Sequence, residues 1–420
     1  MQYPSWKSSR KKSSLRARRR PEQSALYQLI YHYRDKLERT WLECFQSNFG
    51  VLRDEVLAAF DKYLDCGIVA HGCARAVCES CKHSELLAFS CKKRGVCSSC
   101  DAKQACIFAE NLTHNVLLPV EHTHQVFTIP KRLRVYFKFN RELHHLLFQA
   151  AWSAWQELID DALPGCAPAS VMALHSAGDL LNFHPHIHAL TALGGVDGNG
   201  SFHSIESVDT RYLEQVFARE LFESFQNHSL LDSDTISSMK SWSHSGFNVF
   251  VGEPIGPRNT ESRLFVSRYL RKSAISNTRL QIIDEHTVRY TKYSDGAKSH
   301  REFHPLEFLA ELSQHIPNKW EQTVRYFGRY SARARGAKRL REKQLMPISL
   351  IEPSYTPSKT WASCMKKIFE LNPLECPKCG AQMKIKAFIH DTREIIRITE
   401  NLNIQSWIPP PKLPKTKRVA

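Results

Sequence analysis

Three histidines occupy alternate positions in the apolar stretch Asn182-Phe183-His184-Pro185-His186-Ile187-His188-Ala189-Leu190. In an extended strand, residues two apart point to the same face of the sheet. We therefore expect the three histidines to share one side of a strand, with the apolar residues between them on the other side. Two imidazoles that project from one strand can bind a divalent metal ion.

A second pair with the same spacing, His122-Thr123-His124, precedes this stretch. Its central residue is polar and the charged residue Glu121 precedes it, which indicates the exposed start of a strand. The apolar residue between His186 and His188 would instead anchor its strand in a core while both rings face a site. The sequence therefore predicts the metal pair at His186 and His188, with His184 in a supporting role.

The composition is that of a folded protein with a polyanionic partner. The chain has 420 residues, of which 42% are hydrophobic, a size that favours two or three domains. Its formal net charge of +16 indicates nucleic acid, although charge alone leaves a ribosome-associated or membrane-surface protein open. No apolar run reaches the roughly 20 residues that span a bilayer, and no apolar segment follows the basic N-terminus. We expect a cytoplasmic, nucleoid-associated protein with no membrane partner.

Changes of pattern divide the chain into four segments. Residues 1–22 form a basic tail that we expect to be disordered until it binds phosphate. Residues 23–112 combine a helical periodicity with a cysteine-rich stretch, and predict a helical and zinc-binding domain. Residues 113–345 follow the order strand, helix, strand, turn, strand, which predicts an α+β fold with an antiparallel sheet and helices. Residues 346–420 form a C-terminal region with its own cysteine pair.

The cysteines are spaced as metal ligands. The pairs Cys78-x-x-Cys81 and Cys97-x-x-Cys100 are separated by fifteen residues, a spacing typical of two turns that bind one zinc ion. Cys376-Pro377-Lys378-Cys379 is half of another such site. In a reducing compartment these clusters favour metal over disulfides, and the alternative is a group of buried free thiols. Further cysteines offer other ligands or a second metal site: Cys66, Cys73, Cys91 and Cys106.

Five motifs in this order resemble the HUH-type rolling-circle transposases, and most closely the insertion-sequence group with an N-terminal zinc-binding region. They are Ser90–Cys100, Leu181–His188, Ser267–Leu270, Val324–Ser331 and Cys376–Gly380. The resemblance implies a bacterial protein with a central HUH nuclease domain, flanked by a zinc-ribbon-like module and a basic C-terminal region. It also implies structural Zn²⁺, and single-stranded DNA at transposon ends and target DNA as partners. A homo-oligomer is a possible assembly.

The resemblance also implies a role for the histidine strand and for a tyrosine. In this family two histidines, here His186 and His188, bind Mg²⁺ or Mn²⁺, and a tyrosine attacks the scissile phosphate. The tyrosine becomes attached to the 5′-phosphate and a free 3′-OH remains, so that cutting and rejoining need no ATP. A third metal ligand is expected on a neighbouring strand. His175 is the first candidate, since relatives often carry Gln there, and Asp179 is the second.

The candidate nucleophile is Tyr269. The two-tyrosine branch of the family carries tyrosines four residues apart on a helix, but the earlier position here is Phe265. This difference predicts the single-tyrosine branch, as in the common-region elements. Tyr290 and Tyr293 are rivals in a stretch that alternates like a strand, and the alternative for Tyr269 itself is a core aromatic.

Two basic stretches are candidate DNA contacts. The first follows the tyrosine and offers a phosphate-binding face: Arg263, Arg268, Arg271 and Lys272. The second interleaves arginines with Phe327 and Tyr330, a combination that suits backbone contact and base stacking on single-stranded DNA. Its basic residues are Arg329, Arg333, Arg335, Lys338, Arg339, Arg341 and Lys343. The alternative for this second stretch is a solvated basic helix.

These features together predict a transposase that nicks and rejoins single-stranded DNA. Two other functions stay open at this point. A plasmid replication initiator or relaxase would use the same chemistry, with a helicase or long plasmid-type domain for which this chain has no room. A catalytically inactive zinc-ribbon DNA-binding protein would carry the histidine strand as structure alone.

Overall fold

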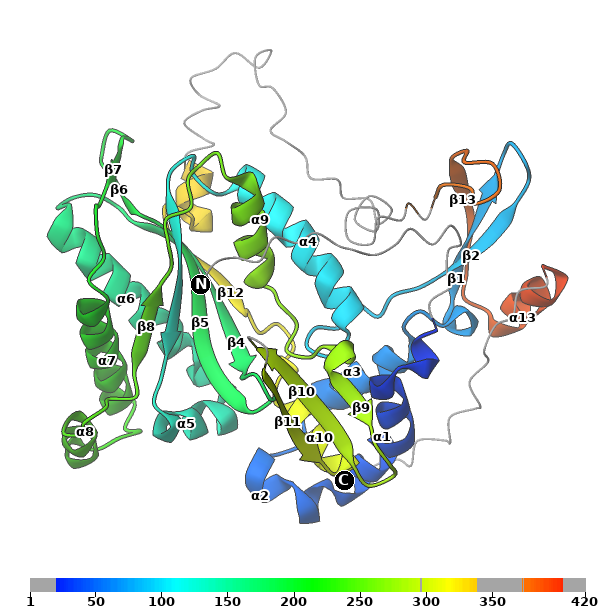
Figure 1. Cartoon of the computed structure of the whole chain (residues 1–420), viewed down its shortest axis with the longest axis horizontal. Coiled ribbons are helices and arrows are strands. Elements are labelled where there is room, and N and C mark those ends of the chain that lie inside the picture. The colour runs from blue at the N-terminus through cyan, green and yellow to red at the C-terminus, as the bar shows by residue number, and fades with distance from the viewer. Residues whose placement is uncertain (1–19, 295–296, 338–371, 373, 403–420) are drawn as a thin grey trace.

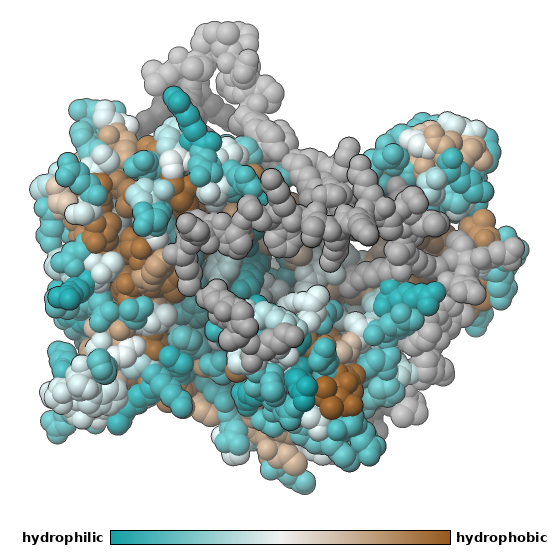
Figure 2. Space-filling view, in the orientation of Figure 1, coloured by the Kyte–Doolittle hydropathy of each residue, from teal (hydrophilic) through white to brown (hydrophobic). Residues whose placement is uncertain are grey.

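The computed structural model describes residues 20–294, 297–337, 372 and 374–402, and combines helices with antiparallel sheets (Figure 1). The predicted α+β class is confirmed. Nearly all of the predicted basic tail and the basic residues from Lys338 to Lys343 lie outside the described residues. No helix in the described part of the chain is both long and apolar enough to cross a bilayer. Hydrophilic residues cover much of the face in Figure 2, with hydrophobic residues in smaller patches.

The histidine stretch forms a strand in the middle of a five-stranded sheet. The order of the sheet is β12-β4-β5-β3-β8, and every neighbouring pair is antiparallel. The strands are β3 (His122–Thr128), β4 (Ala169–Ala177), β5 (Phe183–Ala192), β8 (Asn248–Val251) and β12 (Val324–Gly328).

The two faces of β5 bury different cores, as its alternation predicts. Ile187 and Ala189 pack in a core with helices α6 (His144–Ala162) and α7 (Thr210–Asn227). Leu190, two positions beyond His188, packs on the opposite face with helices α4 (Ser98–Asn115) and α9 (Thr260–Tyr269). The helices accordingly lie on either side of the sheet in Figure 1.

The N-terminal helical stretch folds against a segment far along the chain. It forms α1 (Ala25–Cys44), α2 (Gln46–Phe49) and α3 (Asp54–Asp65), and the chain turns between α2 and α3 at Gly50, where φ is +76°. Their apolar side chains share one core with α10 (Pro305–Ser313). The same core includes the sheet of β9 (Leu280–Ile282), β10 (Val288–Ser294) and β11 (Ala297–Phe303). The predicted boundary near residue 112 therefore does not separate two cores.

The predicted C-terminal region is also not a separate unit in its described part. Its strand β13 (Met383–Ile389) pairs with β1 (Cys73–Cys78), which in turn pairs with β2 (Ser84–Ala88). Helix α13 (Thr392–Asn401) buries Ile395 against Val69 and Cys73. The predicted division at residue 346 is corrected, because β13 supplies the edge strand and α13 the apolar cover that β1 needs.

The remaining elements are short. They are η1 (Pro21–Gln23), η2 (Val69–His71), η3 (Lys131–Leu133), α5 (Arg134–Phe139), η4 (Arg141–Leu143), β6 (Gly194–Val196), β7 (Phe202–Ser204), α8 (Ser233–Lys240) and η5 (Asn277–Arg279).

Gly328 gives a test of how β12 is attached to the sheet. Its φ is +55°, and a Cβ there would lie 1.9 Å from the carbonyl oxygen of Pro168. We expect Gly328→Ala to lower the free energy of unfolding by about 2–4 kcal/mol, because it adds backbone strain to a clash with main chain. Urea unfolding measures the loss, and Gly256→Ala, whose new methyl meets nothing within 4 Å, is the matched control. Equal stability of the two variants would contradict the placement of β12.

Candidate functional site

The structure brings together the three histidines predicted as metal ligands. His175 on β4 lies directly opposite His186 on β5 in the register of the sheet. The ring centroids of His175 and His188 are 4.3 Å apart, and those of His186 and His188 are 4.8 Å apart. One ligand atom from each ring lies within 4.8 Å of the other two. We call this group the histidine triad.

The hydrogen bonds of the triad leave one ring nitrogen free on each residue. Carbonyl oxygens only accept, so His186 donates through Nδ1 to the His184 oxygen at 2.7 Å and keeps Nε2 unprotonated. His175 donates through Nε2 to the Leu270 oxygen at 3.3 Å and keeps Nδ1 unprotonated. Nε2 of His188 is buried and has no hydrogen-bond partner among the described residues. This donor set fits a divalent cation, which needs neutral imidazoles with free lone pairs.

Burial keeps these imidazoles neutral. It lowers the pKa of His175 to about 3, and it also lowers the pKa of His186. Burial lowers the pKa of His188 as well, and the neighbouring His175 adds to this effect because two cations would repel each other. At neutral pH the triad therefore presents lone pairs and no charge.

His124 is a site residue that the sequence prediction missed. Its Nε2 lies 3.0 Å from Nδ1 of His188, and the two rings stack with centroids 5.1 Å apart. A hydrogen bond from His188 Nδ1 to His124 leaves His188 Nε2 as the free nitrogen, so His124 orients the ligand. Its position two residues beyond His122 was visible in the sequence.

The predicted exposure of His122 and His124 is wrong. His122 is fully buried and His124 is 9% exposed, because β3 is an interior strand with neighbours on both sides. The polar residue between them, Thr123, is satisfied by a hydrogen bond to the Gly252 oxygen at 2.6 Å. A polar central residue is thus compatible with an interior position when the next strand offers an acceptor.

Tyr269 lies over the triad at the last residue of α9. Its ring centroid is 5.0 Å from that of His188 and 5.7 Å from that of His175. The Lys272 ammonium lies 4.9 Å from the same ring. Of the rival tyrosines on β10, Tyr290 is buried and its hydroxyl accepts a hydrogen bond from the Ser276 amide.

A cavity of about 490 Å³ opens beside the tyrosine and the triad. Basic side chains line it: Arg94, Arg141, Arg271, Lys272 and Arg279. Asp179, the second candidate for a third ligand, also lines the cavity, but its carboxylate forms an ion pair with Lys292 at 2.6 Å. Among the described residues, the group of potential metal ligands contains His175 with His186 and His188, and it does not contain Asp179.

The predicted basic residues near Tyr269 divide into two kinds. Arg268 is exposed on α9, and Arg271 and Lys272 line the cavity. Arg263 is instead buried, and its guanidinium donates to the Leu118 oxygen at 2.8 Å and to the Pro257 oxygen at 3.1 Å. The predicted phosphate contact at Arg263 is therefore wrong, because this side chain caps main-chain carbonyls.

The aromatics of the second basic stretch belong to the core. Phe327 stacks on Trp152 with centroids 5.2 Å apart. Tyr330 is 1% exposed, and its hydroxyl lies 2.6 Å from Nε2 of His122. The prediction that these rings stack on bases is wrong. Arg329 and Arg333 are exposed, whereas Arg335 donates its Nε to the Tyr330 oxygen at 3.0 Å.

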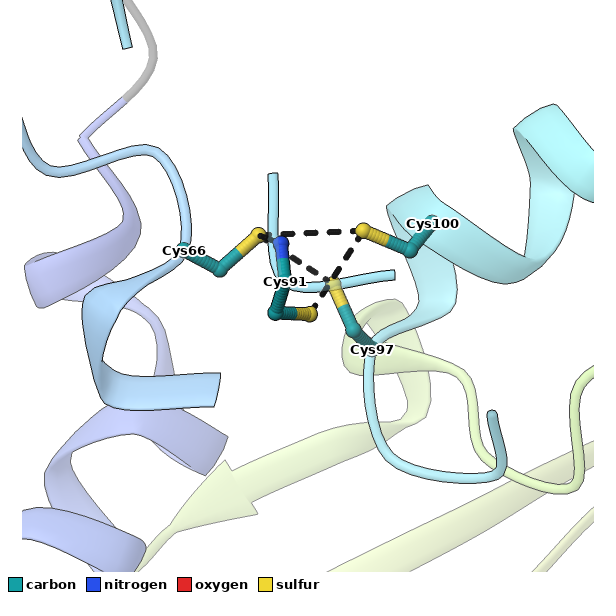
Figure 3. A group of neighbouring side chains, drawn as sticks. All are labelled: Cys66, Cys91, Cys97 and Cys100. Atoms are coloured by element: carbon teal, nitrogen blue, oxygen red, sulfur yellow. Dashed lines mark hydrogen bonds between the residues drawn. The ribbon is translucent and has the colours of Figure 1, made fainter. Parts of the chain in front are cut away.

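The first cysteine cluster contains Cys66, Cys91, Cys97 and Cys100 (Figure 3). Sulfur–sulfur distances are 3.7 Å between Cys66 and Cys97 and 3.5 Å between Cys91 and Cys100. Four sulfurs bound tetrahedrally to zinc at about 2.3 Å lie about 3.8 Å apart, so the cluster has the size of a zinc site. Hydrogen bonds from neighbouring cysteines lower the pKa of the Cys66 thiol, which favours the thiolate.

The second cluster combines two Cys-x-x-Cys pairs that lie far apart along the chain. Cys78 lies 3.5 Å from Cys379, and Cys81 lies 3.5 Å from Cys376, sulfur to sulfur. A backbone hydrogen bond from Cys81 lowers the pKa of the Cys78 thiol to about 6. The predicted single site of Cys78, Cys81, Cys97 and Cys100 is therefore wrong. Spacing along the chain could not show that β13 returns to β1 and completes one half-site with Cys376 and Cys379.

The first cluster is connected to the tyrosine through α4. Asp101 directly follows Cys100, and its carboxylate accepts hydrogen bonds from the Ser273 hydroxyl at 2.8 Å and from the Gly95 amide at 3.1 Å. Ser273 lies four residues after Tyr269. Burial raises the pKa of Asp101 to about 6. A bound metal would hold the start of α4, and with it the loop that follows the tyrosine.

The two clusters predict two zinc ions per chain. We expect Cys66→Ser and Cys376→Ser each to lower the zinc content from two to one, because each removes a ligand from a different tetrahedral set. Elemental analysis of purified protein measures the ratio, and the exposed Cys44→Ser should keep both ions. Two ions in Cys376→Ser would contradict the second cluster.

Two family models match the parts of the chain that contain these residues. Residues 37–129 match the family model described as a transposase zinc-binding domain, and residues 170–338 match one described as a putative transposase. The first range contains all four cysteines of the first cluster, and the second contains the triad and Tyr269. No solved structure gives a significant match.

Two curated relatives cover most of the chain. The transposase for insertion sequence element IS801 of Pseudomonas savastanoi pv. phaseolicola is 28% identical over 81% of this chain and 85% of its own length. The putative transposase y4qJ of Sinorhizobium fredii is 24% identical over 77% of this chain and 87% of its own length. With both regions in the same order, the chain belongs to the IS91 family of insertion-sequence transposases.

Proposed function

We propose that this transposase nicks and rejoins single-stranded DNA at the ends of its insertion sequence, through a phosphotyrosine at Tyr269. The observation that carries the proposal is the position of this tyrosine, whose ring lies 5.0 Å from that of His188. A nucleophile beside a cation site can attack a phosphate that the cation polarises. Rolling-circle transposition needs such a reaction at each element end.

The tyrosine would perform the covalent step. Its hydroxyl oxygen attacks the scissile phosphorus and loses its proton, while the bond from phosphorus to the 3′-oxygen breaks. The 3′-oxygen takes up a proton and leaves as a free hydroxyl, and the 5′-phosphate stays on Tyr269. Rejoining reverses the step with an incoming 3′-hydroxyl. Lys272, 4.9 Å from the tyrosine ring, supplies a positive charge close to the phosphate.

The triad is the proposed site of Mg²⁺ or Mn²⁺. A bound ion would withdraw electron density from the phosphate and stabilise its developing negative charge. His175, His186 and His188 present the three free nitrogens, and His124 orients His188 from behind. The bound DNA strand would follow the cations of the cavity, with Arg271 beside the tyrosine.

The exposed arginines of the second stretch are proposed as more distant contacts to the DNA backbone. Arg329 and Arg333 lie just after β12, and their side chains face solvent. We assign them to phosphate contact alone, because the neighbouring Phe327 and Tyr330 pack in the cores of the protein. An inactive DNA-binding protein would keep these contacts but form no covalent adduct, and this difference separates the two functions.

Tyr269→Phe tests the nucleophile. We expect wild-type protein with Mn²⁺ to form a covalent adduct on a single strand that carries the element end, and Tyr269→Phe to form none. A labelled strand that migrates with the protein on a denaturing gel measures the adduct, and mass spectrometry locates it. Tyr293→Phe, at an exposed position of β10, should react like wild type. An adduct in Tyr269→Phe would refute the assignment, and no adduct in wild type would refute the enzymatic function.

His124→Ala tests the orientation of the metal ligand. We expect it to weaken Mn²⁺ binding roughly 10- to 100-fold, the usual effect of losing a residue that orients a histidine ligand. Calorimetric titration of the zinc-loaded protein measures the affinity. His184→Ala is the matched control, since it keeps the main-chain oxygen that orients His186. An equal loss in both variants would argue against a specific role of His124.

A further inference from the structure

We propose that Trp320 is a stacking platform for a base of the single-stranded DNA that enters the cavity beside Tyr269. This inference rests on the proposed function, since it assumes a single strand as the substrate. Trp320 is 85% exposed, the highest value among the exposed large hydrophobic side chains of the described residues. A tryptophan in water lacks the burial that usually stabilises this side chain.

The backbone at Trp320 is strained. Its φ is +67°, in the left-handed region that disfavours a bulky side chain. The Glu321 amide donates to the Asn318 oxygen at 3.2 Å, which makes Trp320 the third residue of a tight turn. Glycine or asparagine is the usual residue at this position when φ is positive. Such strain persists where the surrounding structure imposes it, and it clusters at functional sites.

A partly buried ion pair and several hydrogen bonds fix the turn in place. Glu321 accepts hydrogen bonds from Arg141 Nε at 2.9 Å and from His144 Nδ1 at 3.1 Å. The Asn318 amide donates to the same carboxylate at 2.8 Å. Arg94 donates to the main-chain oxygen of Glu321 at 3.0 Å. The turn is therefore anchored on both sides of Trp320, and the ring projects from a rigid base.

The turn borders the cavity of the candidate site. Pro317 and Thr323, which flank it, both line the cavity, as do two of its anchors, Arg94 and Arg141. The Lys319 ammonium lies 5.7 Å from the Trp320 ring. A flat aromatic surface with an adjacent cation fits one nucleotide, since the ring stacks on the base and the ammonium neutralises the phosphate. Because stacking accepts every base, Trp320 would hold the strand without reading its sequence.

Binding of two synthetic strands separates stacking from charge. The probes are a fluorescein-labelled oligothymidylate of about 20 nucleotides and an abasic strand of the same length. We expect Trp320→Ala to weaken binding of the oligothymidylate about tenfold, as for one lost base–aromatic stack, and to leave the abasic strand unaffected. Trp320→Phe should keep most of the affinity. Lys319→Ala should weaken both strands equally and reduce the salt dependence by about one phosphate contact.

Trp320→Gly tests whether the loss of binding in Trp320→Ala merely reflects a less stable protein. Glycine accepts the positive φ, so this variant should melt at a higher temperature than wild type while it loses the same affinity as Trp320→Ala. Trp242→Ala, at a half-exposed tryptophan just after α8, should bind both strands like wild type. Unchanged oligothymidylate binding in Trp320→Ala would overturn the inference, and so would an equal loss on the abasic strand.

The adduct assay distinguishes a failure of this inference from a failure of the proposed function. With the element-end strand, Trp320→Ala should raise KM and leave kcat unchanged, because the stacking contact holds the strand but does not touch the reacting atoms. Normal adduct formation with unchanged KM would refute the platform and leave the function of Tyr269 intact. If wild type forms no adduct and binds no single strand, both proposals fail.

Discussion

The antiparallel pairing of β5 with β4 is the constraint on which the candidate site depends. Strand β5 alone aligns His186 and His188, but these two imidazoles supply only two ligands to a metal ion. The register places His175 opposite His186 and so adds the third nitrogen. A shift of one residue would turn every second side chain to the other face and disperse the group. The sheet must therefore be held firmly, and helices cover it on both sides.

The cysteine clusters extend this constraint to the tyrosine. The first cluster holds the start of α4, and α4 packs against α9, which ends at Tyr269. Asp101 joins the same helix to Ser273 in the loop beyond the tyrosine. Metal bound to these cysteines would thus restrict the helix that carries the proposed nucleophile, although the cysteines lie outside the triad. The second cluster instead joins the end of β1 to the segment before β13, across 301 residues of the chain.

Buried polar groups explain several differences between prediction and structure. His122, Arg263 and Tyr330 carry polar groups that usually face solvent, yet each is buried with a partner from a distant segment. Sequence patterns assign such residues to the surface, because their partners cannot be seen in a local window. The same reason hid His124, whose partner His188 lies 64 residues away. Trp320 is the opposite case, since this apolar side chain lies exposed on a turn that Glu321 anchors.

The amino-acid sequence alone determined the α+β class, the family, and which residues of the histidine strand share one face of the sheet. These features depend on local periodicity and on short ordered motifs. It also identified six of the eight cluster cysteines, since thiols in Cys-x-x-Cys pairs have few other uses in a reducing compartment. Cys66 and Cys91 were offered as ligands together with Cys73 and Cys106, which belong to neither cluster. The tertiary structure decided which cysteines share a cluster and where the cores divide. It also placed His124 behind His188. These depend on contacts between segments far apart along the chain, as between Cys78 and Cys379, which are 301 residues apart. Spacing along the chain sets which ligands are available, and only the fold sets which of them meet.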